Sequence, residues 1–135
     1  MKAKIDLACV IDDDPIFTYT TKKMMDSIQF SKDYLFFKNG DEAIEYFKVA
    51  FKNKEKIPEV IFLDLNMPVM DGWEFLDEFT SFPVKHEVVI YIVSSSINPF
   101  DIEKAKTYEK VSNYIIKPIN ISDLKKILNT LTSQS

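Results

Sequence analysis

The 135-residue sequence contains one cysteine, Cys9, and only two glycines, Gly40 and Gly72. A single cysteine excludes a disulfide scaffold and a multi-cysteine metal cluster, and we expect Cys9 to be a small buried hydrophobic residue because it lies in an apolar run. Two glycines are too few for the glycine-rich loops that hold nucleotide phosphates. No apolar run approaches the ~18 residues that span a bilayer, and no secretory leader opens the chain. We therefore expect a soluble, cytoplasmic protein with no membrane partner.

The charged residues are mixed in sign, with 17 basic and 21 acidic side chains and a formal net charge of −4. This balance argues against a nucleic-acid partner, because sequence-independent binding of nucleic acids needs clustered basic residues. Hydrophobic residues make up 46% of the chain. A chain of this length buries roughly two-thirds of its unfolded surface, so it can form a hydrophobic core without disulfides or structural zinc. We expect residues 1–135 to form one domain.

Short apolar runs alternate with amphipathic helical patterns along the whole chain. Strands are predicted at residues 5–11, 34–37, 60–63, 88–93 and 114–116. Helix starts are predicted at Pro15 after the cap Asp14, after Asn39, at Trp73, at Asn98-Pro99 and at Ser122. Near-continuous apolar strands separated by helices are typical of a parallel sheet covered on both faces. The sequence therefore predicts an α/β fold, with a doubly wound five-stranded parallel sheet and five helices in three α/β/α layers.

Polar side chains follow four of the predicted strands, at the point where each strand ends. Asp12 and Asp13 follow the first strand, Asp64 the third, Ser94 the fourth and Lys117 the fifth. Ligands of doubly wound sheets bind outside the carboxyl ends of the strands, so we expect these side chains to converge on one site. Clustered carboxylates repel one another unless a cation lies among them, and Mg²⁺ prefers such oxygen ligands. A carboxylate beside that metal can attack phosphorus, while the metal and the lysine neutralise the phosphoryl charge.

Four segments surround this predicted site: VIDDDP (10–15), FLDLNMPVMDGWEFL (62–76), IVSSS (92–96) and YIIKP (114–118). With these segments the chain resembles the receiver domains of two-component response regulators over nearly its full length, and among them the stand-alone regulators of the chemotaxis type. The four segments together are highly specific. The resemblance implies the flavodoxin-like form of the predicted fold, and a single receiver domain over residues 1–135 with no output domain.

The resemblance also implies a role for each acidic residue of the site. Asp64 corresponds to the phosphoacceptor, and Asp13 and Asp64 to direct ligands of Mg²⁺. Asp12 corresponds to a residue that binds the metal through water, and the backbone carbonyl of Asn66 completes the protein ligands. Asp14 is expected to be only a helix cap.

A conformational switch is implied by the same resemblance. Ser94 corresponds to the switch hydroxyl, Tyr114 to an aromatic residue that rotates, and Lys117 to the lysine that pairs with the phosphate. The Lys117-Pro118 peptide is expected to be cis, as in the family. Phosphorylation is then expected to shift a conformational population and to alter the surface formed by the helix after Asn98, the last strand and the last helix.

Several positions depart from the commonest family pattern or vary within it. Ser94 stands where many relatives have threonine, which keeps the hydroxyl donor and removes a methyl group. Asn113 stands where a pair of small residues usually precedes the aromatic residue, which predicts a different backbone course before the last strand. Ser96 and Asn66 occupy positions that tune how fast the acyl phosphate hydrolyses in the family.

The implied function is a phosphorylation-activated switch of a two-component phosphorelay, not an enzyme acting on other substrates. The phosphoryl group would come from a phosphohistidine on a sensor histidine kinase or a histidine phosphotransfer protein. Output would pass through contact with a downstream protein, which the sequence does not identify, or with a second copy of the chain in an activated homodimer.

Two alternatives remain open at this point. A Mg²⁺-dependent phosphohydrolase of the haloacid dehalogenase type also forms an aspartyl phosphate, but it carries a second aspartate two residues after the nucleophile, where this chain has Asn66. A pseudo-receiver would bind partners without phosphorylation. The complete set of acids, hydroxyl and lysine counts against this alternative. Outside the site, His86 is expected at the surface and residues 52–56 in a solvated connection.

Overall fold

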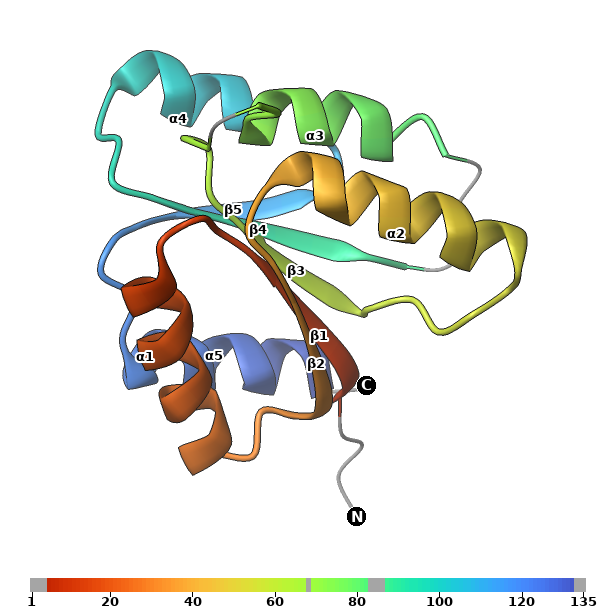
Figure 1. Ribbon diagram of the computed structural model, residues 1–135. Helices are drawn as coiled ribbons and strands as arrows, with labels where there is room; N and C mark the ends of the chain where they lie inside the picture. Colours follow the sequence, from red (N-terminus) through yellow and green to blue (C-terminus); the bar gives the residue numbers. More distant parts are fainter. Residues whose placement is uncertain (1–4, 68, 83–86, 133–135) are drawn as a thin grey trace.

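The computed structural model describes residues 5–67, 69–82 and 87–132, so His86 lies outside the described residues. The strands in the described part are parallel and form one sheet in the order β2-β1-β3-β4-β5, with β2 and β5 at the edges (Figure 1). They are β1 (Ile5–Ile11), β2 (Ser31–Phe37), β3 (Val60–Leu63), β4 (Val89–Ser94) and β5 (Val111–Ile116).

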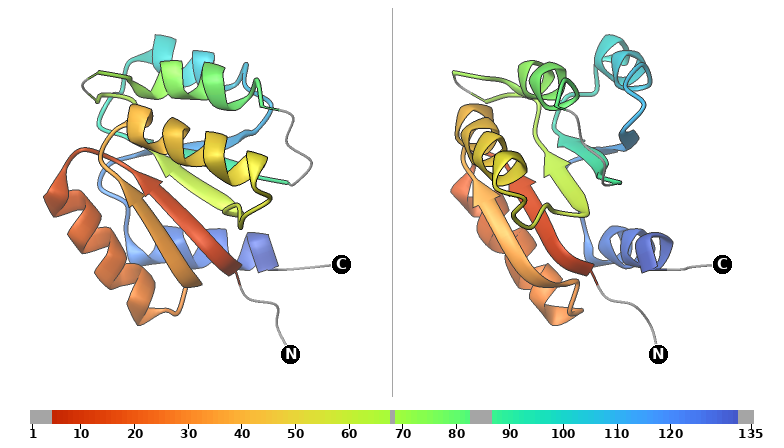
Figure 2. Two further views of the ribbon diagram at one scale, coloured as in Figure 1. Left: turned by 45° about the vertical axis from the view of Figure 1, so that its right-hand side comes forward. Right: turned by 90° about the vertical axis from the view of Figure 1, so that its right-hand side faces the viewer.

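Helices cover both faces of this sheet. The described residues form α1 (Pro15–Ser27), α2 (Gly40–Lys52), α3 (Gly72–Phe79), α4 (Pro99–Ala105) and α5 (Ile121–Thr132). Helices α1 and α5 lie on one face, and α2, α3 and α4 lie on the other (Figures 1 and 2). The predicted doubly wound, three-layer α/β/α fold is confirmed. Among the described helices, none has the length and apolar character needed to cross a bilayer.

Side-chain caps fix the starts of four helices. Asp14, Asn39 and Asn98 each accept a hydrogen bond from a backbone amide in the first turn of α1, α2 and α4. Asp71 forms a capping box with Glu74 at the start of α3. The predicted starts at Pro15, after Asn39 and at Asn98-Pro99 are therefore confirmed, and Asp14 is the cap of α1. Because each helix begins directly after a strand-ending loop, these caps also fix the loops that carry the polar residues.

Large apolar side chains fill both interfaces between the sheet and the helices. The cluster under α2 and α3 includes Ile11, Ile44, Phe47, Phe75 and Phe79. The cluster under α1 and α5 includes Val10, Met25, Phe62, Leu124 and Ile127. Cys9 is fully buried, as predicted, and its burial raises the pKa of the thiol. The strands are thus held on both faces, which fixes the positions of their carboxyl ends.

The edge strands are longer than predicted. Strand β2 begins at Ser31 rather than at residue 34, and β5 begins at Val111 rather than at residue 114. The additional residues include exposed polar side chains, which hide the strand pattern because an edge strand is only partly covered. The β4-β5 ladder also changes register between Ile90 and Tyr91, and Tyr91 pairs with Asn113. This irregularity lies where the sequence predicted a different backbone course.

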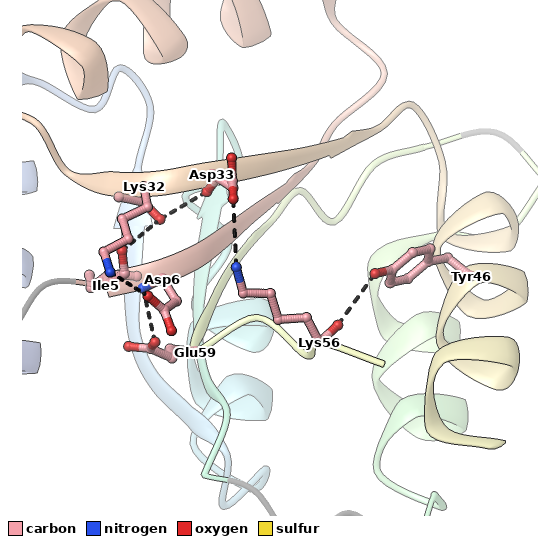
Figure 3. Close-up of polar contacts among 8 residues, drawn as sticks. Ile5, Asp6, Lys32, Asp33, Tyr46, Lys56 and Glu59 are labelled. Carbon is pink, nitrogen blue, oxygen red and sulfur yellow. Dashed lines mark hydrogen bonds and ion pairs between the residues drawn. The ribbon is translucent and has the colours of Figure 1, made fainter. Parts of the chain in front are cut away.

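The amino ends of the strands, opposite the candidate site, carry a polar network (Figure 3). Lys32 lies 3.3 Å from Asp6, Lys56 lies 3.6 Å from Asp33, and the Asp6 amide donates to Glu59 at 3.0 Å. All four side chains of the ion pairs are more than half exposed, so each pair stabilises the fold by at most about 1 kcal/mol. This network joins the beginnings of β1, β2 and β3. Residues 52–56, which were expected in a solvated connection, are exposed, and Lys56 among them contacts the network.

Candidate functional site

Three carboxylates meet at the carboxyl end of the sheet. Asp12 and Asp13 follow β1, and Asp64 follows β3. One oxygen atom from each of the three carboxylates lies within 4.8 Å of the others. Asp12 and Asp64 are buried and Asp13 is exposed. The parallel arrangement of β1 and β3 therefore brings together the acidic residues that the sequence placed at the ends of separate strands.

The two carboxylate oxygens of Asp12 have different partners. Its Oδ1 atom accepts a hydrogen bond of 2.9 Å from the Asp14 amide. Its Oδ2 atom lies 2.9 Å from Lys117 Nζ and forms an ion pair with this ammonium group. Burial raises the pKa of Asp12, against the opposing effects of the Asp14 amide and Lys117. Because burial outweighs these opposing effects, this carboxylate is suited to a further cationic ligand.

Asp64 is 6% exposed, and its Oδ2 atom lies 3.9 Å from Lys117 Nζ. Burial, followed by the negative charge of Asp12, raises the pKa of Asp64 to about 6, while Lys117 and the Asn66 amide oppose this rise. One ammonium group is therefore shared by two buried carboxylates. Carboxylate oxygens are the ligands that Mg²⁺ prefers, and this excess of negative charge fits a hard divalent cation.

Lys117 is held in place from several sides. Its backbone amide donates to the Ser94 carbonyl at 2.8 Å, which fixes the end of β5 beside the end of β4. Its side chain is 19% exposed, and Nζ lies 4.4 Å from the centroid of the Phe17 ring. Such a cation-π contact holds the ammonium over the carboxylates. The Lys117-Pro118 peptide is cis, as the sequence resemblance implied.

Ser94 is fully buried at the end of β4. Leu63 pairs with Ile92 in the β3-β4 ladder, so Ser94 lies one residue beyond the level of Asp64. The Ser94 hydroxyl oxygen accepts a hydrogen bond of 3.1 Å from the Ser96 amide. Tyr114, on β5, is half-buried, and its hydroxyl donates to the Ser96 carbonyl at 2.9 Å. The two residues assigned to the switch are therefore joined through Ser96.

Gly72 permits a close contact that the sequence interpretation missed. Its amide donates to the Leu65 carbonyl at 2.9 Å, which folds the loop after Asp64 back on itself. A Cβ atom added at Gly72 would lie 2.5 Å from the Asp64 carbonyl oxygen and 2.8 Å from Leu65 Cα. Asn66 is exposed in this loop. The only feature of the sequence that could have indicated this role is that glycine is rare, since Gly72 is one of two glycines in the chain.

An open groove of about 690 Å³ adjoins the acidic cluster on the side of α1 and the end of β2. Its lining residues include Asp12, Asp13, Tyr19, Phe36 and Lys38. The groove thus reaches Asp12 and the exposed Asp13, whereas Asp64 is not among its lining residues.

The fold and this arrangement of acids, hydroxyl and lysine define the class of the protein. The sequence model of the response regulator receiver domain matches residues 8–129, and the chain belongs to this family. It is therefore a receiver domain of the kind found in two-component systems, whose role is that of a phosphoryl-accepting signalling switch. The hydrolase and pseudo-receiver alternatives are not favoured.

Individual relatives agree with this membership. The crystal structure of a two-component response regulator from Cytophaga hutchinsonii superposes with a TM-score of 0.87 at 28% identity, over 98% of this chain and 100% of that one. A protein-glutamate methylesterase/protein-glutamine glutaminase from Methanococcoides burtonii is 30% identical over 126 residues, which are 93% of this chain and 33% of the relative. The chain thus spans about a third of that enzyme.

A second similar structure is the receiver domain of a sensor histidine kinase from Pseudomonas aeruginosa PAO1, with a TM-score of 0.75 and 18% identity over 98% of this chain and 100% of that one. In that protein a magnesium ion is coordinated in the active-site cleft. At this level of identity the likeness shows the shared fold.

Proposed function

We propose that Asp64 accepts a phosphoryl group from a phosphohistidine, on a sensor histidine kinase or a histidine phosphotransfer protein. The observation that carries this proposal is the cluster of three carboxylate oxygens within 4.8 Å, with Lys117 Nζ 2.9 Å from Asp12 and 3.9 Å from Asp64. We propose Asp12, Asp13, Asp64 and the Asn66 carbonyl as the groups that hold Mg²⁺. The excess of negative charge, with one ammonium group near two buried carboxylates, supports this assignment.

The transfer exchanges one bond to phosphorus for another. An oxygen of Asp64 forms a bond to phosphorus as the P–N bond to the donor imidazole breaks, and the bonding electron pair stays on the imidazole nitrogen. Lys117 neutralises charge on the phosphoryl oxygens, because its ammonium already lies between the two carboxylates. A bound Mg²⁺ supplies the additional positive charge that lets the phosphoryl group approach the carboxylates. Asn66, two residues after Asp64, offers no acid for the hydrolase chemistry.

The proposed switch begins at Ser94. A phosphoryl group on Asp64 offers the Ser94 hydroxyl a strong acceptor, and Tyr114 responds because both residues contact Ser96. The usual allosteric coupling of ~1–3 kcal/mol would shift the conformational equilibrium ~5–150-fold. The surface around α4 and β5 exposes Ile97, Phe100 and Ile116 at 71%, 69% and 45%. We propose that a downstream protein or a second copy of the chain binds there.

These 135 residues are proposed to form one receiver domain, which is supported by the family match over residues 8–129. The proposed activity is limited to its own phosphorylation and dephosphorylation, so the chain is not an enzyme in the sense of the larger methylesterase relative. We place it in the cytoplasm with its phosphodonor.

The direct test is the intact mass after incubation with Mg²⁺ and acetyl phosphate. We expect one added phosphoryl group, which is absent from Asp64→Asn and from a magnesium-free sample but present in Asp41→Asn, a matched change of an exposed acid on α2. Phosphate released catalytically without an adduct, in a manner dependent on Asp64, would favour the hydrolase. Magnesium binding with neither adduct nor release would favour a constitutive binding module.

A further inference from the structure

We propose that Asp101 is a positioning residue of this switch, and that it transmits a displacement of Ser94 to α4 through the hydroxyl group of Ser96. The inference rests on the proposed function, because it concerns the structural response to phosphorylation of Asp64. It adds a specific mechanical link between the phosphoryl site and one helix.

Ser96 is the point where three elements meet. Its amide donates to the Ser94 hydroxyl oxygen at the end of β4, at 3.1 Å. Its carbonyl accepts from the Tyr114 hydroxyl on β5 at 2.9 Å. Its own hydroxyl donates to Asp101 Oδ2 on α4 at 2.7 Å. The partly buried Ser96 thus forms hydrogen bonds to three different elements, one through its amide, one through its carbonyl and one through its hydroxyl.

The hydrogen bond to Asp101 has a defined direction and is the strongest kind in this loop. The Ser96 hydroxyl oxygen accepts from the Asn98 amide at 3.3 Å, so its proton is directed to the Asp101 carboxylate. A hydroxyl-carboxylate bond is shorter and about twice as strong as a neutral pair. Asp101 lies in the first turn of α4, where Asn98 caps the helix. The bond therefore ties the loop after Ser94 directly to the beginning of α4.

The carboxyl end of α4 (Lys104) and the turn that follows it (Tyr108) contact α3. The Tyr108 hydroxyl donates to Asp77 at 2.7 Å, and the Tyr108 ring stacks on Trp73 at a centroid distance of 5.8 Å. Lys104 Nζ lies 4.6 Å from the centroid of the Trp73 ring. With this end held by side chains of α3, a displacement transmitted through Asp101 tilts the beginning of α4 relative to Trp73.

The tilt has a consequence at the surface. Ile97, in the loop after Ser96, and Phe100, in the first turn of α4, precede Asp101 in the chain and are 71% and 69% exposed. When the Ser94 hydroxyl turns toward a phosphoryl group, the Ser96 amide follows or loses its acceptor. The bond to Asp101 then carries this displacement to the helix turn that bears Phe100.

The test compares four proteins treated with acetyl phosphate and Mg²⁺: wild type, Asp101→Ala, Asp101→Asn and Glu103→Gln. Asp101→Asn keeps an acceptor oxygen for the Ser96 hydroxyl. Glu103→Gln is the matched control: it removes a negative charge from the same helix, but the Glu103 side chain pairs with Lys106 rather than with the loop after Ser94. Intact mass measures phosphorylation, and amide hydrogen exchange of residues 97–105 measures the response of α4.

We expect an adduct in all four proteins, because neither Asp101 nor Glu103 contacts the carboxylates of the site. In wild type, Asp101→Asn and Glu103→Gln, phosphorylation changes exchange in residues 97–105 by roughly fivefold or more, whereas in Asp101→Ala the change falls below about twofold. A Ser96→Ala/Asp101→Ala double variant should show no further loss beyond Asp101→Ala.

The outcomes distinguish a failure of this inference from a failure of the proposed function. Absence of an adduct in wild type refutes phosphorylation of the chain itself. An adduct in wild type, with no exchange response in α4 or with an undiminished response in Asp101→Ala, overturns the role of Asp101 and leaves Asp64 as the acceptor. Emission from Trp73, which contacts both Lys104 and Tyr108, gives a second readout of the same displacement.

Discussion

Asp64→Asn is expected to stabilise the metal-free fold even though it removes the proposed phosphoacceptor. In the folded chain, burial and the charge of Asp12 raise the pKa of Asp64 from 3.8 to about 6. Ionised Asp64 therefore destabilises the folded state relative to the unfolded chain, where the carboxylate is hydrated. An asparagine has nearly the same shape and carries no charge, so the substitution removes this penalty.

The raised pKa also fixes the direction of the pH dependence. Between pH 3.8 and about 6 the folded chain retains a proton on Asp64 that the unfolded chain has released. Stability contributed by this group is consequently lost as the pH rises through that window, and the full penalty applies above it. Raising the pKa of Asp64 from 3.8 to about 6 corresponds to a penalty of about 3 kcal/mol in the free energy of folding, at 1.36 kcal/mol for each pKa unit. The pKa of about 6 already includes the opposing attraction of Lys117, so we expect a net gain of about 1–3 kcal/mol at neutral pH.

The assay is urea unfolding of wild type and Asp64→Asn in the presence of a chelator, from pH 4 to pH 8. The variant should be more stable above pH 6, and the difference should fade toward pH 4. Glu78→Gln, a change of an exposed acid on α3, is the matched control and should show no such trend. Added Mg²⁺ should stabilise wild type more than the variant, because the cation relieves the same repulsion. A variant that is equally or less stable at every pH would refute the electrostatic reasoning.

Three further substitutions test other contacts. Lys117→Met removes the ammonium 2.9 Å from buried Asp12 and should lower the unfolding free energy without metal by about 3–5 kcal/mol, with partial recovery in Mg²⁺, as measured in urea. Gly72→Ala places a Cβ atom 2.5 Å from the backbone of Asp64, so we expect a loss of about 1–3 kcal/mol and a lower yield of the phosphoryl adduct by intact mass. Phe47→Ala empties a fully buried position and should cost about 3–5 kcal/mol in urea, while the folded fraction still forms the adduct.

The parts of the fold that the sequence predicted well are those whose residues are uniformly buried. Strand β3 has the predicted bounds, Val60–Leu63, because all four of its residues are apolar and covered on both faces. The first residues of β2 and β5 were missed, since side chains such as Lys32 and Asn113 face solvent at the sheet edges. Their pairing with β1 and β4 decides their conformation, and this pairing is not visible in local hydrophobicity.

The convergence of the site residues could be predicted because it follows from topology alone. Parallel strands place Asp12, Asp64 and Lys117 at one edge of the sheet regardless of how the helices pack. The contacts that set their chemistry could not be predicted in the same way. The Phe17 ring lies 4.4 Å from the Lys117 ammonium, and this contact between α1 and the end of β5 has no signal in the spacing of the sequence. The bond between Ser96 and Asp101 depends on the conformation of the loop between β4 and α4, which no spacing rule specifies.

A single ammonium shared by two carboxylates explains how one lysine can serve both states of the switch. Lys117 Nζ lies 2.9 Å from Asp12 and 3.9 Å from Asp64, so a displacement of about one ångström reverses which carboxylate it favours. A phosphoryl group on Asp64 adds negative charge and acceptor oxygens on that side. The ammonium would then turn toward Asp64, and Asp12 would lose its only ion-pair partner among the described residues. A cation held by Asp12 would compensate for this loss, which links phosphorylation to metal binding through one shared counterion.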